Sequence, residues 1–369
     1  MKRSEILGFL ASKAPLHTAE SWDNVGLLCG DGQKEVHGVL VTLDATMESI
    51  REAEERGCDL LVSHHPMIFQ GMKRVTPDTP EGEKILAMAE RGMGLISMHT
   101  NLDVAEEGVN DALAQALELT NLEVLEPTWW EQWQKLEVYV PASHAEVVRS
   151  ALAEAGAGRL GAYDSCSFSL QGEGRFRPLE GARPFVGELG KPELVQEIKL
   201  EVSAPAAQMG RIIAAMRARH PYEEPAYSVT DTHAPRPALG LGRLGTLPWR
   251  MQWREFLEFV RVRLGAQGLR YVGEEGPVLR VAVGGGACGE FADLAFARGA
   301  DAYVTADCKY HPMLTAWEKG QRLVDAGHFE TEQMVCGRVA NWLRQQWPDL
   351  KVEVTQRRHS VVQYWKQEG

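Results

Sequence analysis

The sequence predicts an α/β protein with a discontinuous outer domain of mixed, largely parallel sheets and an inserted ferredoxin-like α+β domain. Short apolar strands alternate with helices in the first and last thirds of the 369 residues, an alternation typical of a largely parallel sheet covered by helices. The middle of the chain instead follows the order βαββαβ, the ferredoxin-like pattern. We therefore predict an outer domain at 1–130, an inserted domain at 131–235, and the second segment of the outer domain at 236–369.

The outer domain begins with a buried strand at 38–46 (GVLVTLDAT) and a helix at 47–57 that ends at Gly57, as glycine C-caps do. The same alternation continues to the insert, with strands at 59–63 and 93–98 and helices at 82–91 and 106–119. It resumes after the insert, with strands at 279–283, 301–305, 322–325 and 351–355 and helices at 290–298 and 331–347, the last one stopped by Pro348.

The inserted domain shows two βαβ-like halves with period-two strands. Its predicted strands are 135–140, 163–170, 196–203 and 225–231, and its predicted helices are 144–155 and 206–219.

Charge and cysteine content exclude several classes of protein. The chain has 39 basic and 51 acidic residues, and a net charge of −12 argues against a general nucleic-acid binder. The six cysteines are scattered without a C-x-x-C pair, so reduced thiols in a cytoplasmic protein are the simpler interpretation. No apolar run approaches the roughly 18 residues of a membrane span.

Two adjacent histidines, His64 and His65, directly follow the strand predicted at 59–63. Ligand sites in open α/β sheets lie at the carboxyl ends of strands, and adjacent side chains there point to different sides, so the two imidazoles could serve different metal ions. His99 and Asp103 follow the next strand at the same sheet edge. The alternatives are an ordinary histidine pair and, for Asp103, a helix N-cap.

A third strand end precedes His328 and Glu332, which are four residues apart and face the same way on a helical turn. Acidic residues also favour helix N-termini, which explains Glu330 better than His328. The three strand ends together supply three histidines and two carboxylates, enough for two metal ions, especially if one carboxylate bridges. Nitrogen and oxygen ligands without thiolate suit Zn, Mn, Fe, Co or Ni, so we expect two divalent ions per chain.

Other polar segments admit two interpretations. Asp307 follows a predicted strand, and His311 comes soon after it. They fit groups that orient ligands or substrate, and equally a helix cap and a surface histidine. His220-Pro221-Tyr222-Glu223-Glu224 in the insert looks like a metal site, but a loop that is rich in proline need bind nothing.

Two glycine-rich segments have a ligand-binding and a purely structural interpretation. Gly284-Gly285-Gly286 lies between a strand and a helix, where it fits a phosphate-binding turn or, more commonly, a tight turn alone. The segment 240–245 (GLGRLG) has the spacing of a dinucleotide fingerprint. We reject that interpretation because Pro235 and Pro237 precede it where a strand is required.

The chain resembles the GTP cyclohydrolase I type 2 homologues, also called the Nif-three-like dinuclear-metal proteins, through 1–128 and 236–369. The insert is similar to the one that longer bacterial members carry. The motifs that carry the resemblance are Trp22-Asp23-Asn24-Val25-Gly26-Leu27, Ser63-His64-His65-Pro66, His99-Thr100-Asn101-Leu102-Asp103, Thr305-Ala306-Asp307 and Gly327-His328-Phe329-Glu330-Thr331-Glu332. Ala306 departs from the family, which usually has glycine there.

The resemblance implies a homohexameric toroid with metal centres facing an internal cavity. It also implies His64, His65, Asp103, His328 and Glu332 as metal ligands, with Glu332 as the bridging carboxylate. This set agrees with the one that the three strand ends predict.

Two functions follow as hypotheses. The first is a metal-dependent hydrolase of a nucleotide-like or heterocyclic small molecule, either GTP cyclohydrolase-like or a phosphoesterase, with His99 and Asp307 as the catalytic candidates. The second is a non-enzymatic metal-binding or ligand-sensing toroidal scaffold, so the sequence leaves open whether the protein is an enzyme.

Overall fold

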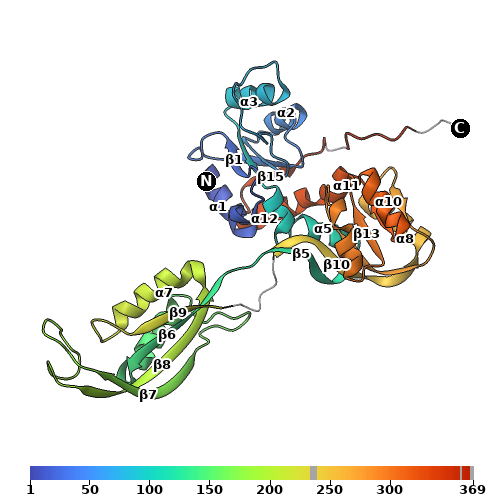
Figure 1. Ribbon diagram of the computed structural model, residues 1–369. Coiled ribbons are helices and arrows are strands. Elements are labelled where there is room, and N and C mark those ends of the chain that lie inside the picture. Colours follow the sequence, from blue (N-terminus) through green and yellow to red (C-terminus); the bar gives the residue numbers. More distant parts are fainter. Residues whose placement is uncertain (233–238, 358–359, 366–369) are drawn as a thin grey trace. The chain divides into compact units, whose positions relative to one another are not determined.

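The computed structural model describes residues 1–232, 239–357 and 360–365. Its contacts divide the chain into two compact units, which we call the outer unit (Met1–Trp129 with Ala238–Gly369) and the inserted unit (Trp130–Pro237) (Figure 1). The domain boundary predicted at 235/236 lies outside the described residues, as do Pro235 and Pro237, and the three-segment division stays a prediction. Among the described residues, no helix combines the length and apolar character that a membrane span requires.

The first sheet of the outer unit is largely parallel and has helices on both faces. Its elements are β1 (Gly26–Cys29), β2 (Gly38–Thr42), β3 (Leu60–Ser63), β4 (Gly94–Ser97), β15 (Lys351–Val354), α1 (Arg3–Lys13), α2 (Met47–Glu55), α3 (Pro80–Glu90) and α12 (Met334–Gln346). The strand order is β1-β4-β3-β2-β15, with β1 antiparallel at one edge. Val39 and Val41 pack with α1 and α12, whereas Leu40 packs with α2 and α3. Both faces are therefore buried, which explains the continuous apolar runs in the sequence.

The second sheet of the outer unit is mixed, with a parallel centre. Its elements are β5 (Thr120–Trp129), β10 (Leu239–Gln252), β11 (Arg270–Val272), β12 (Pro277–Val283), β13 (Ala302–Thr305), β14 (Leu323–Asp325), α8 (Trp253–Leu264), α9 (Ala292–Ala297) and α10 (Tyr310–Glu318). In the order β11-β14-β13-β12-β10-β5, β12, β13 and β14 are parallel and the other pairs are antiparallel. Phe256 of α8 packs with Val281 on one face, and α9 and α10 pack on the other.

In the outer unit, helices that follow a strand of one sheet pack against the other sheet. After β4 the chain forms α4 (Thr100–Val104) and α5 (Val109–Ala116), and Leu113 of α5 belongs to the core of the second sheet. After β14 the chain forms α11 (His328–Glu332) and α12, and Val339 of α12 belongs to the core of the first sheet. As a result, α4 lies against β10 of the second sheet, and α11 lies against α5.

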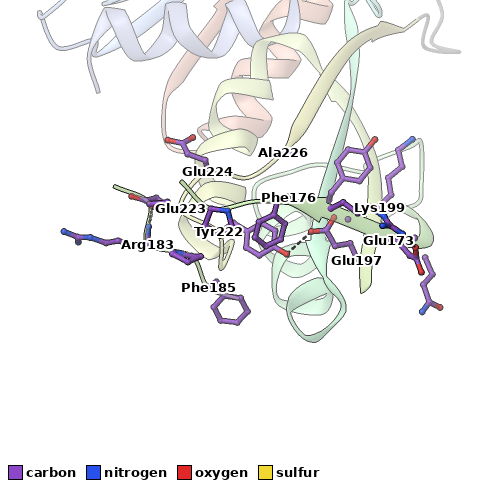
Figure 2. A pocket seen from close by; sticks show the side chains of 18 of the residues that line it. Glu173, Phe176, Arg183, Phe185, Glu197, Lys199, Tyr222, Glu223, Glu224 and Ala226 are labelled. Atoms are coloured by element: carbon purple, nitrogen blue, oxygen red, sulfur yellow. Dashed lines mark hydrogen bonds and ion pairs between the residues drawn. The ribbon is translucent and has the colours of Figure 1, made fainter. Parts of the chain in front are cut away.

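The inserted unit is ferredoxin-like, with the sheet order β7-β8-β6-β9 and antiparallel pairing throughout. Its elements are β6 (Trp133–Pro141), α6 (Ala145–Glu154), β7 (Phe168–Phe176), β8 (Glu193–Pro205), α7 (Ala206–Arg219) and β9 (Tyr227–Thr232). The helices cover one face, where Leu136 and Leu200 are fully buried. On the opposite face, the hydroxyl of Tyr222 donates to Glu197 at 2.8 Å (Figure 2).

Some element positions differ from the prediction. β2 ends at Thr42 rather than at residue 46, so Asp44 lies beyond the strand. The helix predicted at 331–347 is two helices, α11 and α12, which meet at Gln333. β7 covers Phe168–Phe176 instead of 163–170, because Gly172 and Gly174 conceal its alternation of side chains.

The sequence does not predict the long antiparallel pair β5 and β10. Pro127 and Pro248 lie inside these strands, and proline weakens a strand prediction. The register of β10 against β12 shifts between Thr246 and Met251, which accommodates Pro248. The GLGRLG segment at 240–245 lies inside β10, so it is not the strand–helix turn that a dinucleotide fingerprint requires.

Candidate metal centre

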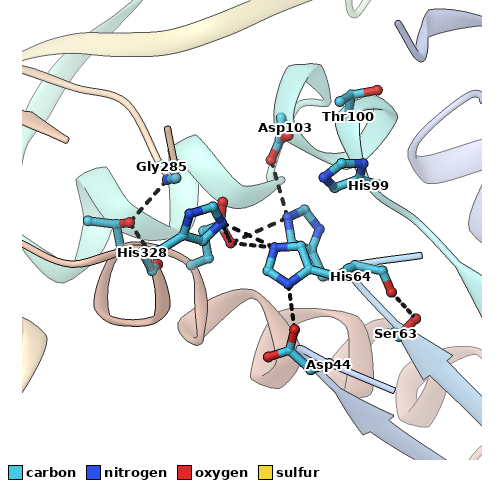
Figure 3. A network of polar contacts seen from close by, with 12 residues as sticks. Asp44, Ser63, His64, His99, Thr100, Asp103, Gly285 and His328 are labelled. Atoms are coloured by element: carbon cyan, nitrogen blue, oxygen red, sulfur yellow. Dashed lines mark hydrogen bonds and ion pairs between the residues drawn. The ribbon is translucent and has the colours of Figure 1, made fainter. Parts of the chain in front are cut away.

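The candidate site lies where strand ends from both sheets converge. His64 and His65 follow β3, and Asp103 lies in α4 after β4. His328 and Glu332 are the first and last residues of α11, which follows β14. Figure 3 shows His64, Asp103 and His328 pointing toward a common centre. The structure thus brings together all five residues for which the sequence predicts a ligand role.

His64 has one ring nitrogen fixed by a hydrogen bond and the other without one among the described residues. Its Nδ1 donates to the carbonyl oxygen of Met98 at 2.8 Å. Nε2 lies 3.6 Å from Oδ1 of Asp103 and 3.7 Å from Oε2 of Glu332, too far for good hydrogen bonds. Both His64 Nε2 and Asp103 Oδ1 are buried without a hydrogen-bond partner in the described part of the chain. Because unpaired buried polar atoms are costly, a cation between them fits this geometry.

His65, His328 and Glu332 form a second group around one carboxylate oxygen. Oε2 of Glu332 lies 3.0 Å from Nε2 of His65 and 3.1 Å from Nε2 of His328. The two nitrogens are 3.3 Å apart. Nδ1 of His65 contacts Asp44 at 2.8 Å, and Nδ1 of His328 contacts Asp307 at 2.7 Å. Carboxylates in this position orient imidazole ligands and increase their basicity.

The electrostatics of the cluster favour positive charge. Burial lowers the pKa values of His65 and His328, but their carboxylate partners outweigh burial and raise them to about 10 and about 9. Burial acts to raise the pKa of Glu332, but His64 and the other imidazoles hold it well below its usual range. Burial raises the pKa of Asp103 despite the nearby imidazoles. A divalent cation would take the place of the imidazole protons that balance the charge.

Three groups of side chains are compact enough to hold a metal ion, with one ligand atom per residue and all atoms within 4.8 Å of one another. Two of the three groups have Glu332 as a common member. Their donors are nitrogen and carboxylate oxygen, which suit the first-row divalent metals and zinc. The groups are His64 with Asp103 and Glu332, His65 with His328 and Glu332, and His64 with His65 and His99.

His99 lies beside the cluster and is oriented by Asp23. Its Nδ1 is 2.8 Å from Oδ1 of Asp23, whose other oxygen accepts from the backbone N–H and hydroxyl of Thr100. Burial acts to raise the pKa of Asp23, but the bonds from His99 and Thr100 lower it to about 2. The ionised Asp23 therefore keeps the proton of His99 on Nδ1 and leaves Nε2 as the acceptor. The His99 ring centroid is 5.2 Å from that of His64.

Asp307 contacts the cluster through His328. Its φ of +50° lies in the left-handed region, which few residues other than glycine adopt, and its carboxylate holds Nδ1 of His328. Thr305 donates to the carbonyl of Gly286 at 3.2 Å. His311 is exposed at the start of α10 and belongs to none of the three groups.

Sequence reasoning missed the roles of Asp23 and Asp44. Asp44 follows a buried strand, as His64 does, but a strand prediction extended to residue 46 concealed it. Asp23 belongs to one of the motifs that carry the family resemblance. Its contact with His99, which is 76 positions later in the chain, is visible only in the folded structure.

The glycine-rich turn after β12 lies against the candidate ligands. A Cβ on Gly286 would overlap Oε1 of Glu332 and lie 3.3 Å from Nε2 of His328. Its φ of +65° also favours glycine. The N–H groups of the turn are already bonded: Gly285 donates to Asn110 at 2.9 Å and Gly286 to Thr331 at 3.1 Å. The turn therefore serves close packing, and the structure does not support a phosphate cradle there.

A cavity of about 1000 Å³ opens beside the cluster, with His65 among its lining residues. Lys73, Arg74 and Lys84 also line it, and none of the three has an ion-pair partner among the described residues. Phe69 lines the cavity and lies 5.7 Å, between ring centroids, from the exposed Trp22. Cationic and aromatic groups thus lie next to the candidate metal centre.

The chain is similar to proteins of one family over nearly its whole length. The family model Duf34/NIF3 (NGG1p interacting factor 3) matches residues 1–360. A GTP cyclohydrolase 1 type 2 homolog of Bacillus subtilis is 42% identical over 334 residues, 90% of each chain. A homolog of the same name from Mycobacterium tuberculosis is 39% identical over 349 residues, 93% of this chain and 92% of that one.

Solved structures agree with this assignment. A Bacillus cereus protein related to NIF3 has a TM-score of 0.87 and 37% sequence identity, and the match covers 99% of both chains. A Staphylococcus aureus protein has a TM-score of 0.82 and 31% identity, again over 99% of both chains.

Proposed function

The chain belongs to the Duf34/NIF3 family, and on that premise we propose that it is a dinuclear-metal hydrolase of a nucleotide-like or heterocyclic small molecule. The observation that carries the proposal is a pair of buried atoms, His64 Nε2 and Asp103 Oδ1, that have no hydrogen bond within the described residues. They lie beside Glu332, which also contacts His65 and His328. These five residues would hold two divalent cations, with Glu332 between them.

The residues around the two ions would position them and manage protons. Ions in such a pair polarise a substrate oxygen and activate water for attack. Asp44 and Asp307 would act as positioning residues, because each contacts the outer nitrogen of one imidazole. His99 would accept a proton on Nε2, since the ionised Asp23 holds the proton on Nδ1.

The cavity beside the cluster supports the proposed class of substrate. Lys73, Arg74 and Lys84 would attract an anionic group such as a phosphate. The exposed rings of Trp22 and Phe69 would pack against a flat heterocycle. A molecule that combines both features could contact His65, which lines the same cavity.

The experiment measures metal content and turnover on the same preparations. The full chain, reconstituted separately with Zn²⁺, Mn²⁺ and Fe²⁺, is assayed by elemental analysis and for hydrolysis of GTP and p-nitrophenyl phosphate. We expect two ions per chain and metal-dependent turnover of at least one compound. His99→Gln should keep both ions and lose turnover, whereas Asp103→Asn should lose metal as well.

The outcomes separate the two functions that the sequence leaves open. Failure to bind metal would refute the dinuclear centre. Two bound ions with no turnover in any metal form, and no change in His99→Gln, would reject the hydrolase and favour the metal-binding scaffold.

A further inference from the structure

The inserted unit contains a cavity that the proposed function does not use. Its volume is about 690 Å³, which is typical of small-molecule sites. Ile198 and Leu200 of β8 pack with α6 and α7, so Glu197 and Lys199, which alternate with them, point to the opposite face. The cavity lies on that open face, with side chains of residues 182–185 and 222–224 around it (Figure 2).

Two glycines of β7 leave space beside Glu197. Gly172 is its register partner on β7, and a Cβ on Gly172 would meet no atom within 4 Å. A Cβ on Gly174 would overlap Oε2 of Glu197. Glycine at both positions therefore keeps the sheet surface open around this carboxylate.

Glu197 is a buried carboxylate with one side-chain hydrogen bond among the described residues. Its exposed fraction is 9%, and Oε1 accepts the Tyr222 hydroxyl at 2.8 Å. Burial and the adjacent Glu197 raise the pKa of Tyr222, so the hydroxyl stays a donor. Lys199 pairs instead with Glu137 at 3.1 Å and Glu201 at 2.6 Å. Glu197 forms no ion pair within the described residues, and a buried charge without a counter-charge favours binding of a cation.

Aromatic side chains form the walls around this carboxylate. The Tyr222 ring centroid lies 5.8 Å from that of Phe176 and 6.4 Å from that of Phe185. His220 holds the loop in place, because its Nε2 donates to the carbonyl of Tyr139 at 2.9 Å and its Nδ1 accepts from Tyr222 N–H at 3.0 Å. Both ring nitrogens of His220 are used, so it is a positioning residue and not a metal ligand.

We propose that this cavity binds a small organic cation with a flat or apolar body and an ammonium group. The ammonium would pair with the free oxygen of Glu197, since hydrogen bonds between charged partners are the strong ones. The body would pack against Phe176 and Tyr222, whose ring faces attract cations. A neutral or anionic molecule would leave Glu197 without a counter-charge. The site shares no residue with the metal cluster and is independent of the proposed hydrolysis.

The test uses three indole probes of nearly equal size on the full-length protein. Tryptamine carries an ammonium, tryptophol is neutral, and indole-3-acetate is an anion. By isothermal titration calorimetry we expect tryptamine to bind about tenfold or more tightly than either of the others, because a charged hydrogen bond is lost with them. Equal affinities, or no binding of tryptamine at millimolar concentration, would overturn the proposal.

Two variants test the site by different means. Glu197→Gln keeps the acceptor for Tyr222 and removes the charge, so tryptamine affinity should fall about tenfold or more. Gly172→Val fills open space on an extended strand and should reduce binding of the same probe. Glu154→Gln on α6, exposed and outside the cavity, is the matched control and should bind as wild type does. Thermal unfolding confirms that each variant is folded, and unchanged binding in both cavity variants would contradict the proposal.

Discussion

Asp44→Asn tests whether the cluster consists of two separable metal positions. Asp44 lies 2.8 Å from Nδ1 of His65 and is not itself in any of the three metal-holding groups. Asparagine keeps the shape and an acceptor oxygen but removes the charge that helps to raise the His65 pKa. Because His65 is grouped with His328 and Glu332, apart from Asp103, we expect one metal position to weaken and the other to remain.

The size of the effect follows from the role of Asp44 as an outer partner of a ligand. Loss of such a carboxylate lowers metal affinity by about 10- to 100-fold, or about 1.4 to 2.7 kcal/mol. Metal-free protein is titrated with Zn²⁺ against a chromophoric chelator. Wild type should show two tight equivalents, and the variant should show one. Asp307→Asn should weaken the same position, because it holds Nδ1 of His328 at 2.7 Å, so the double variant should still retain one tight ion.

The control for charge is Glu48→Gln. Glu48 is exposed and lines the same cavity as Asp44 but contacts no residue of the cluster. An equal loss of affinity in this variant would mean that the net charge of the cavity, and not the orientation of His65, decides metal binding. Equal weakening of both metal positions in Asp44→Asn would refute the division into two groups that share Glu332.

Three further expectations test other parts of the protein. Gly286→Ala places a methyl group against Glu332 and His328 at a φ of +65°, so it should lower metal affinity in addition to the backbone cost to stability of about 1 to 2 kcal/mol. Gly320→Ala, with the same φ and open space around it, is the control in thermal unfolding and metal titration and should show only the backbone cost. Zinc affinity should rise with pH up to about 10, because bound metal displaces protons from His65 and His328, whose pKa values are about 10 and about 9. Calorimetry in buffers of different ionisation enthalpy should detect this proton release at pH 7. If no protons are released, the two histidines are not protonated in the metal-free protein. The homohexamer that the family resemblance implies predicts a native mass six times that of the chain, and a monomer in native mass spectrometry would exclude it.

The sequence predicts the candidate ligands because each follows a strand that the sequence also predicts. The strands before His64 and His99 are largely apolar runs, since both faces of their sheet are covered, whereas the strand before His328 is short and ends in Asp325. Parallel topology then places the ends of neighbouring strands at one edge. Strand patterns alone do not predict that His64 and His328 lie close together, because the two histidines follow strands of different sheets. Their proximity depends on the exchange of α5 and α12 between the two sheets, which no local pattern shows.

The residues that sequence reasoning missed act through contacts between distant segments. Asp44 and Asp23 bind no metal in the proposed centre; each contacts the outer nitrogen of a histidine, 21 positions away for Asp44 and 76 for Asp23. A single acidic residue after a strand is common, and its partner is visible only in three dimensions. The same holds for Glu197, because only the register of β7 against β8 places the open space of two glycines beside its carboxylate.

The glycine-rich segment at 240–245 shows why spacing alone is a weak guide to ligand binding. Its glycines allow close approach of strands: a Cβ on Gly240 would overlap the carbonyl of Glu126 on β5. Between them, the buried Arg243 donates to the carbonyls of Gly240 at 2.9 Å and Ala105 at 3.1 Å, and pairs with Asp111 at 2.7 Å. Ala105 directly follows α4, the helix that carries the candidate ligand Asp103. A segment with the spacing of a cofactor motif therefore fixes β10 against the end of α4 through Arg243, and its glycines are explained by close packing against the neighbouring strands.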